Sequence, residues 1–454
     1  MRLSPTAKAA AVPTAGASDS SRIGAMLSAA WSMAHRWKGR IFYAVLDQGF
    51  ASSANFLLTI LCVVWMPLDA FGRYVIVWSV SLLVETAQVS LILDAMPAIV
   101  ARYGQRNRRR LDAAGLWVVL IYGALTSVLI LASVPGFTIW APEFVLPMLC
   151  LAAANPFQRA YIFLRRLCYI RDRQDVAAAA SFAYGVALIG GGCALHLAGA
   201  LSVHAVVLVW GLANGVAVVV IYLRGLAIPG RLYPAQALWL GRQLWRSGRW
   251  LIAAAIGTWA TTWGMLPLIA ATAGVETAGV IRALQNLFTP IVQFNAALNL
   301  AILPRVADNV VVKGPQYARS FAFYSTALFL ALVVVYAGLV MSEAKPILSL
   351  LYRKPEIAAG AYLLWPLGLA MILESGRQGS QMALLSLNVT RPFFVSRVIA
   401  VAVFLVGALA LGRIWSADGI LWAYAMSHAA GTAFVIYAAF SRLSPSRPDN
   451  SLAR

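Results

Sequence analysis

The sequence contains few charged residues, and acidic residues are the scarcest of them. Only 11% of its 454 residues are Asp, Glu, Lys or Arg, whereas 61% are hydrophobic and the mean hydropathy is +0.77. About a quarter of the residues in an ordinary soluble domain are charged, so this chain lacks the side chains needed to cover a surface that faces water. The composition therefore excludes a typical soluble protein and indicates a polytopic membrane protein.

Short chemical motifs are also missing. The four cysteines and four histidines are scattered along the chain, so neither a disulfide framework nor a metal site is indicated. Neither a Gly-x-x-x-x-Gly-Lys nor a Gly-x-Ser-x-Gly pattern occurs, and we expect no cofactor and no enzymatic activity. Residues 1–21, rich in Ala, Ser, Thr and Pro, are expected to form a disordered tail rather than a signal sequence.

Twelve apolar runs are long enough to cross about 30 Å of hydrocarbon, which takes roughly 20 residues each. They lie near residues 41–66, 73–98, 116–136, 142–164, 176–198, 203–226, 250–271, 277–303, 321–341, 361–386, 393–413 and 419–440. The predicted fold class is an all-α polytopic membrane protein with about 12 transmembrane helices in two pseudo-symmetric six-helix lobes. The predicted parts are a tail with a surface helix (1–40), an N-lobe (41–226), an interlobe link (227–249), a C-lobe (250–440) and a second tail (441–454).

The basic residues are distributed unevenly between the two sides of these spans. The tails and even-numbered links carry 29 Lys and Arg residues, and the odd-numbered links carry five. Basic residues concentrate on the cytoplasmic side of membrane proteins, so both tails are predicted to be cytoplasmic. This bias also accounts for the formal net charge of +20 without nucleic acid, and the basic loops are expected to contact anionic membrane lipids.

The two halves of the chain resemble each other. Asp69-Ala-Phe-Gly72 matches Glu276-Thr-Ala-Gly279, each at the start of an even-numbered span. Gln158, Leu164, Leu167 and Arg171 match Gln378, Leu384, Leu387 and Arg391 further along. A repeat of six spans keeps the same orientation, so the copies are expected to be related by an axis along the membrane normal, with a cleft between them.

Polar residues within the spans are the candidates for lining this cleft, because polar and charged groups inside a membrane usually serve function. Span 8 carries Arg282, Gln285, Asn286, Thr289 and Gln293 at helical spacing, on a helix that Pro290 can bend. Gln378, Gln381 and Asn55 are further candidates for the substrate cavity. Glu85, Glu374 and Asp47 are candidates for ion coupling, with Arg377 as a charge partner one turn after Glu374.

Each of these residues also has a structural interpretation. Glu374 and Arg377 can neutralise each other, and amide side chains can hold helices together. Arg159 is expected to extend its guanidinium towards the nearby membrane surface.

Four segments together resemble the oligosaccharide flippases of the multidrug/oligosaccharidyl-lipid/polysaccharide exporter superfamily. They are Asp47-Gln-Gly-Phe-Ala-Ser-Ser-Ala-Asn-Phe56, Phe71-Gly72-x-Tyr74, Ala278-Gly-Val-Ile-Arg282-Ala-Leu-Gln-Asn-Leu-Phe-Thr-Pro290 and Leu303-Pro304. The predicted span number fits the O-antigen and exopolysaccharide flippases of that superfamily. Spans 1 and 2 carry no arginine apart from Arg73, which departs from the cationic cavity of its lipid II flippases.

The resemblance implies a protein of the bacterial inner membrane that turns polyprenyl-diphosphate-linked oligosaccharide from the cytoplasmic to the periplasmic leaflet. The implied partners are the lipid-linked oligosaccharide, membrane lipids, and the polymerase and export machinery of polysaccharide synthesis. Two alternatives remain open at this stage. One is a cation-coupled drug or metabolite exporter of the same superfamily, and the other is a membrane-embedded polysaccharide polymerase or ligase.

Overall fold

The structure is a computed structural model that describes residues 19–442 except 97–98, 100–107, 226–233, 296–305, 307–308, 311–313, 388 and 390. The outermost parts of both predicted tails, part of the interlobe link, the basic loop at 100–107 and the Leu303-Pro304 motif lie outside the described residues. The described residues form helices and connecting turns without any β-strand.

The helices of the N-lobe follow the predicted spans closely, because a run of apolar residues in lipid must satisfy its backbone hydrogen bonds internally. They are α1 (Asp19–Trp65), α2 (Leu68–Gln88), α4 (Arg108–Trp140), α5 (Val145–Ile170), α6 (Gln174–Leu197) and α7 (Val203–Leu223). α2 continues as a short π-helix, η1 (Val89–Leu93), and a 3₁₀ turn, η2 (Pro142–Phe144), precedes α5.

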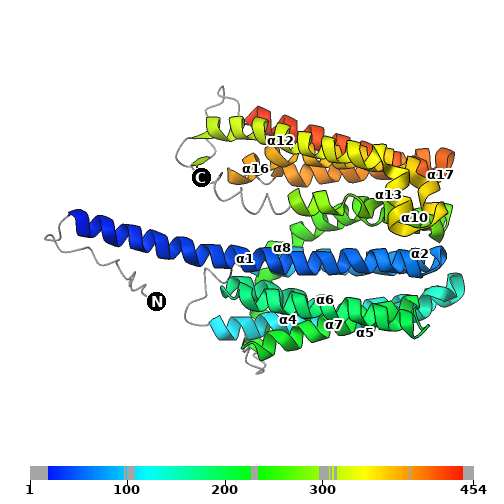
Figure 1. Cartoon of the computed structure of the whole chain (residues 1–454), viewed down its shortest axis with the longest axis horizontal. Coiled ribbons are helices and arrows are strands. Elements are labelled where there is room, and N and C mark those ends of the chain that lie inside the picture. The colour runs from blue at the N-terminus through cyan, green and yellow to red at the C-terminus, as the bar shows by residue number, and fades with distance from the viewer. Residues whose placement is uncertain are drawn as a thin grey trace.

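Helix α1 contains both the first span and the stretch predicted as a surface helix. Its 47 residues correspond to about 70 Å at 1.5 Å per residue, more than twice the hydrocarbon thickness. The beginning of α1 therefore extends beyond the rest of the bundle, as Figure 1 shows in dark blue. The surface location of the helix predicted within residues 1–40 stays a prediction.

The C-lobe uses shorter and more interrupted helices. They are α8 (Pro234–Thr262), α9 (Met265–Ala273), α10 (Val275–Asn286), α12 (Pro315–Ser342), α13 (Ala344–Tyr352), α14 (Pro355–Ala359), η3 (Gly360–Leu363), α15 (Leu364–Gly376), α16 (Gln378–Ser386) and α17 (Arg391–Arg442). Helix α17 combines the last two spans and reverses at Ser416, whose φ of 53° is not helical. Gly419 allows this tight reversal, because a side chain there would collide with the Leu411 carbonyl.

Nine helical segments of the described residues are long and apolar enough to cross a membrane by length and composition. One of them is the folded-back α17, which contains two of the predicted spans. α5 has 26 residues but carries three arginines, and the span beginning with α10 runs into residues outside the described part. Counting α17 as two crossings and adding α5 and the span that begins with α10, the helices agree with the twelve predicted crossings. α1 begins and α17 ends towards the same end of the molecule (Figure 1).

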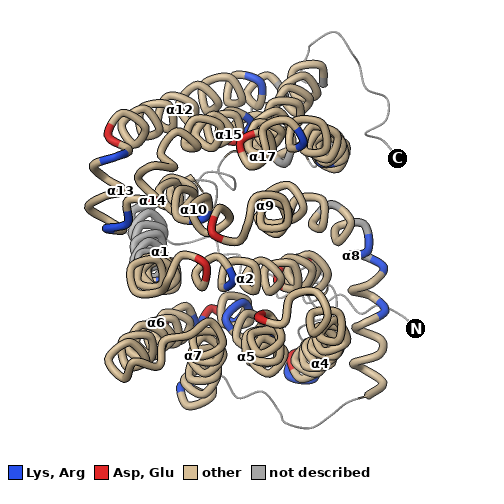
Figure 2. The backbone as a smooth tube through the Cα atoms, turned by 90° about the vertical axis from the view of Figure 1, so that its right-hand side faces the viewer, with Lys and Arg blue, Asp and Glu red and all other residues tan. Residues whose placement is uncertain are grey.

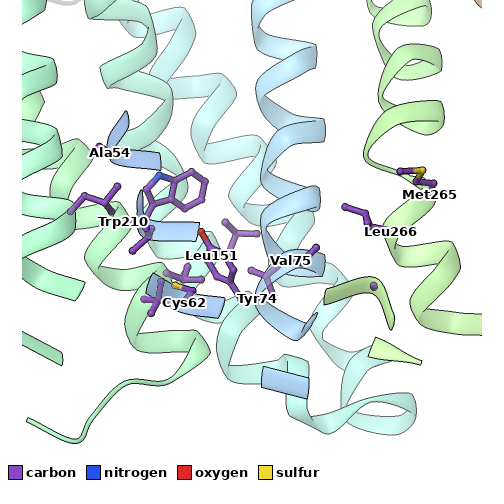
Figure 3. Packing of buried hydrophobic residues seen from close by; sticks show 14 of the residues in the cluster. Ala54, Cys62, Tyr74, Val75, Leu151, Trp210, Met265 and Leu266 are labelled. Carbon is purple, nitrogen blue, oxygen red and sulfur yellow. The ribbon is translucent and has the colours of Figure 1, made fainter. Parts of the chain in front are cut away.

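The two lobes lie side by side, with α1 and α2 facing α9 and α10 between them (Figure 2). α8 crosses from the C-lobe to contact α2, η1 and α4 of the N-lobe. Buried side chains of both lobes form one continuous cluster. Part of it appears in Figure 3, with Tyr74 and Val75 of α2 between Trp210 on one side and Leu266 of α9 on the other. In lipid this packing stabilises the fold through van der Waals contact, since lipid tails are as apolar as the side chains.

The lobes contact each other at one end through Gly72 and Gly279, the last residues of the two segments that match between the halves of the sequence. A Cβ built on Gly279 would lie 3.3 Å from the Gly72 Cα, and one on Gly72 would collide with the Val275 carbonyl. Glycine is needed at both positions because α2 and α10 approach each other backbone to backbone. The Lys354 ammonium, just after α13, donates to the Met66 carbonyl at the end of α1. We call this end, defined by Gly72, Gly279 and Lys354, the closed end.

Candidate functional site

A cavity of about 580 Å³ lies between the two lobes. Its wall contains residues of α1, α2, α5, α6 and α7 on one side and of α8, α10, α15 and α17 on the other. The wall includes Gln48, an exposed residue of α1 at the side away from the closed end. The position between two related lobes is the one expected for a transporter's binding site.

The predicted polar stripe of span 8 faces this cavity. Arg282, Gln285, Asn286, Thr289 and Gln293 all belong to its wall. α10 ends at Asn286, and the chain turns at Leu287 and Phe288 before helix resumes. Pro290 has no N–H to donate to the Asn286 carbonyl, which explains the interruption. The stripe thus follows both parts of the broken helix along the cavity.

Arg282 is the most unusual member of the stripe. Its side chain is 7% exposed, and its guanidinium lies 4.6 Å from the ring centre of Trp78 and 5.2 Å from that of Trp263. These rings belong to different lobes and stabilise the cation through their π faces. Within the described part of the chain, no acidic side chain forms an ion pair with Arg282. Its positive charge is therefore available to an anion in the cavity.

Asn55 lies on the N-lobe side in a hydrogen-bonded row that also contains two aromatic residues. The Tyr184 hydroxyl donates to the Asn55 side-chain oxygen over 2.9 Å, and the Trp210 indole N–H donates to the Tyr184 oxygen over 3.0 Å. All three line the cavity. The sequence analysis missed Tyr184 and Trp210, although an aromatic residue with a polar atom inside an apolar span is a usable signal.

Glu85 lines the cavity but is not alone there. Gln158 donates to its carboxylate over 3.2 Å, and Arg159 interacts with it electrostatically. The prediction that Arg159 extends to the membrane surface is wrong. Its side chain is fully buried and donates to the side-chain oxygens of Gln88 (3.2 Å) and Ser81 (3.5 Å). α2 therefore supplies partners that make turning inward more favourable than reaching water.

Asp47 is fully buried behind the cavity wall and is not part of it. Arg165 donates to it through Nε over 2.9 Å and lies 2.8 Å away through Nη2. The hydroxyls of Tyr169 and Ser181 also donate to it, each over 2.5 Å. Four donor contacts around one carboxylate make a neutral, well-satisfied cluster that ties α1 to α5 and α6.

A polar link crosses from one lobe to the other beside this cluster. Arg165 donates to the Gln48 side-chain oxygen over 3.0 Å, and Gln48 donates to the Gln293 oxygen over 3.1 Å. The link joins α1 to the second part of span 8. Gln293, predicted from the stripe alone, thus contacts the opposite lobe.

In the C-lobe, Glu374 lines the cavity and pairs with Arg377, which lies behind the wall. Asn295 donates to Ser375 next to this pair. Gln378 and Gln381 lie on α16, outside the residues that form the cavity wall. His428, which the sequence analysis did not single out, lies 2.8 Å from Glu374 and lines the cavity.

No protein-family model and no curated protein sequence matches this chain. Among solved structures, the chain is similar to an inward-facing multidrug resistance MATE family transporter of the MOP superfamily, with a TM-score of 0.71, 10% identity and coverage of 88% of this chain and 98% of that one. It is also similar to the lipid II flippase MurJ in an inward closed conformation (TM-score 0.64, 10% identity, 89% and 90% covered). A mutant of the Vibrio cholerae MATE transporter VcmN matches with a TM-score of 0.63, 13% identity and coverage of 91% and 97%.

These likenesses extend over nearly the whole of each chain, so the protein has the fold of the MOP superfamily transporters. The predicted fold class is confirmed, and the protein is a multi-pass membrane protein. The sequence identities are too low to transfer a substrate from any of these proteins.

Proposed function

We propose that the protein is a flippase that moves polyprenyl-diphosphate-linked oligosaccharide across the bacterial inner membrane for synthesis of exopolysaccharide or O-antigen. The single observation that carries this proposal is Arg282, a buried cation in the cavity wall without an ion pair among the described residues. A diphosphate is the anion that such a lipid would bring to it, and guanidinium groups bind phosphate oxygens through strong charge-assisted hydrogen bonds.

The remaining wall suits the saccharide. Asn55, Gln285 and Asn286 place amide groups in the wall, beside the aromatic rings of Tyr184 and Trp210. Such groups can replace water around sugar hydroxyls, while the polyprenyl chain stays in the surrounding lipid. The two lobes would rock about the closed end and present the cavity to each side in turn.

A drug or metabolite exporter that takes organic cations is the second candidate, and the two carboxylates in the wall favour it. Each of them already has a partner: Glu374 has Arg377, and Glu85 has Gln158 and Arg159. A carboxylate neutralised in this way attracts a cation weakly, whereas Arg282 attracts an anion without competition. The balance of charges therefore favours the flippase.

Energy for transport would come from an ion gradient, with Glu85 as the preferred coupling group. Asp47 and Glu374 are each held in an ion pair with an arginine, so we assign them to structure rather than to ion coupling. Within the described residues Glu85 forms no ion pair with an arginine; its carboxylate accepts a hydrogen bond from Gln158, interacts with Arg159 electrostatically and faces the cavity. The partners proposed for the protein are lipid-linked oligosaccharide, membrane lipids, and the polymerase and export machinery.

The proposal is tested by replacing Arg282. Arg282→Ala should lower the rate of polysaccharide export about tenfold to a hundredfold, since hydrogen bonds to charged groups contribute about 1.5–3 kcal/mol. Arg282→Lys should retain part of the rate, because it keeps the charge but loses the planar fork. Arg413→Ala, at an exposed position on α17, is the matched control. The lipid that accumulates in the Arg282→Ala strain is then extracted and identified. Full export at normal protein level, or accumulation of no diphosphate-linked saccharide, would contradict the proposal.

A further inference from the structure

Two tyrosines that lie outside the cavity wall contact the interruption in span 8. Tyr352 is the last residue of α13 and is fully buried, and Tyr336 lies on α12. The Tyr352 hydroxyl donates to the Ala283 carbonyl over 3.0 Å, and the Tyr336 hydroxyl donates to the Leu287 carbonyl over 2.6 Å. Hydroxyls from two other helices therefore reach the same short stretch of backbone.

The hydrogen bonds of this stretch explain why the Ala283 carbonyl needs a side-chain donor. In a regular α-helix the Leu287 N–H would donate to the Ala283 carbonyl, four positions back. Here it donates instead to the Leu284 carbonyl, three positions back, over 3.1 Å. A backbone carbonyl freed inside a membrane protein is costly, and a side chain of a neighbouring helix can satisfy it. The Tyr352 hydroxyl supplies this bond and so stabilises the interruption.

Side-chain hydrogen bonds extend this support across the interruption. The Asn286 amide donates to the Tyr352 hydroxyl oxygen over 3.4 Å, and the Thr289 hydroxyl donates to the Asn286 side-chain oxygen over 3.3 Å. The row of bonds runs from the Ala283 carbonyl, directly after Arg282, to Thr289 beyond the turn. It therefore joins the two parts of the broken helix, and both parts contribute to the cavity wall.

Filling space does not require these hydroxyls. Phenylalanine would occupy the same volume without the cost of burying a polar group. The hydroxyls are needed because span 8 is broken, and the break lies next to Arg282. The Arg282 guanidinium contacts Trp78 of one lobe and Trp263 of the other, and such contacts are lost beyond about 6 Å. The position of Arg282 therefore tolerates little movement of the backbone that carries it.

We infer that Tyr352 and Tyr336 are positioning residues for anion binding, which hold the interruption of span 8 in the geometry that presents Arg282 to the cavity. Tyr352 has the larger effect, because its hydrogen bonds begin next to Arg282 and continue across the break. Tyr336 supports the turn itself through Leu287. This inference rests on the proposed function and adds to it the groups that set the affinity of the cavity for the diphosphate.

The support of the backbone is tested by hydrogen–deuterium exchange on the purified full chain in nanodiscs. Tyr352→Phe removes the hydroxyl and keeps the ring. The backbone N–H groups of residues 284–292 should then exchange about fivefold to tenfold faster, the effect of one lost hydrogen bond. Tyr324→Phe is the matched control, because this tyrosine of α12 is 71% exposed, and it should leave the exchange unchanged. Unchanged exchange in Tyr352→Phe would overturn the inference.

The effect on the anion site is tested by binding of undecaprenyl diphosphate to the same preparations. Tyr352→Phe should bind this probe about fivefold to tenfold more weakly than the unaltered protein, and Tyr336→Phe about twofold to threefold more weakly. Tyr324→Phe should bind it normally. In an Arg282→Ala background, Tyr352→Phe should weaken binding by less than about twofold, because the group that it positions is gone. A tyrosine that only stabilises the fold would have the same effect in both backgrounds.

The outcomes separate the inference from the proposed function. Faster exchange with unchanged binding in Tyr352→Phe, or an equal loss of binding with and without Arg282, would reject the positioning role and leave the flippase proposal standing. Failure of the unaltered protein to bind undecaprenyl diphosphate would reject the flippase proposal, and the inference with it.

Discussion

At the scale of single residues, the described part of the chain holds charges that are neutralised in ion pairs and a cavity cation, Arg282, that is not. Asp47 with Arg165 and Glu374 with Arg377 are paired, whereas Arg282 rests on two indole rings. A charge inside a membrane protein is costly unless paired, so a pair is explained by stability alone and an unpaired charge calls for a ligand. This difference, rather than the number of charged residues, indicates the chemistry of the cavity.

The Asp47 cluster leads to a prediction on stability. Asp47→Asn removes the charge that balances Arg165 and should lower the free energy of unfolding by about 3 kcal/mol, the usual cost of breaking a buried ion pair. Asp175→Asn is the matched control, because the Arg173–Asp175 pair is exposed and should contribute less than about 1 kcal/mol. Thermal unfolding in detergent measures both. An equal, small loss in the two variants would show that Asp47 is not a structural charge.

Five of the candidate residues could be found from the sequence because they lie on one predicted span. The stripe from Arg282 to Gln293 faces one cavity because positions three, four, seven and eleven apart lie on one helical face. Arg165 and His428 could not be found in this way. Arg165 meets Asp47 across 118 positions of sequence, and His428 reaches Glu374 from another helix. Contacts of this kind depend on how helices pack, which the pattern within one helix does not encode.

At the scale of helices, the hydropathy of the sequence predicted most helix ends to within a few residues of where they lie in the structure. α6 was predicted at 176–198 and runs from Gln174 to Leu197, since the length of an apolar run and the thickness of lipid determine both. The interruption between α8 and α9 and the π-helix after α2 were not predicted. They depend on tertiary contacts, such as that of Gly248 on α8, whose added Cβ would lie 2.9 Å from the Leu91 Cα. Hydropathy carries no information on such approaches.

The contact of α2 with α10 at the closed end leads to a prediction on gating. Gly72→Ala places a methyl group against the Val275 carbonyl, and overpacking of this kind costs about 1–3 kcal/mol. Closure at this end should weaken by about tenfold or more. A cysteine at Thr262 in the cavity wall, in a chain without its four native cysteines, should then react faster with an impermeant thiol reagent applied from the closed end.

Gly190→Ala is the matched control for this experiment, since nothing lies within 4 Å of a Cβ at that position of α6. It should leave the rate at the Thr262 cysteine unchanged. If Gly72→Ala also leaves that rate unchanged, the glycine contact does not close the cavity.

At the scale of the whole molecule, the orientation in the membrane decides which leaflet supplies the cavity. The Gly72–Gly279 side is closed by backbone contact between α2 and α10, and we infer that the cavity opens on the opposite side, where the exposed Gln48 reaches Gln293 of the other lobe through a side-chain hydrogen bond. With the tails and even-numbered links in the cytoplasm, as the 29 basic residues there predict, the cavity opens towards the cytoplasmic leaflet. That is the leaflet from which a flippase for lipid-linked saccharide must take its substrate, so the proposed function requires this orientation.

Cysteine labelling in intact cells tests the orientation. Arg109 is exposed at the start of α4, and Ala198 is exposed directly after α6, on opposite sides of the predicted N-lobe spans. In the chain without native cysteines, a cysteine at Ala198 should react with an impermeant thiol reagent, because the link after α6 is predicted to be periplasmic. A cysteine at Arg109 should react only after the cells are opened. Labelling of Arg109 with protection of Ala198 would place the open cavity on the periplasmic side, and the protein would then take its substrate from outside the cell.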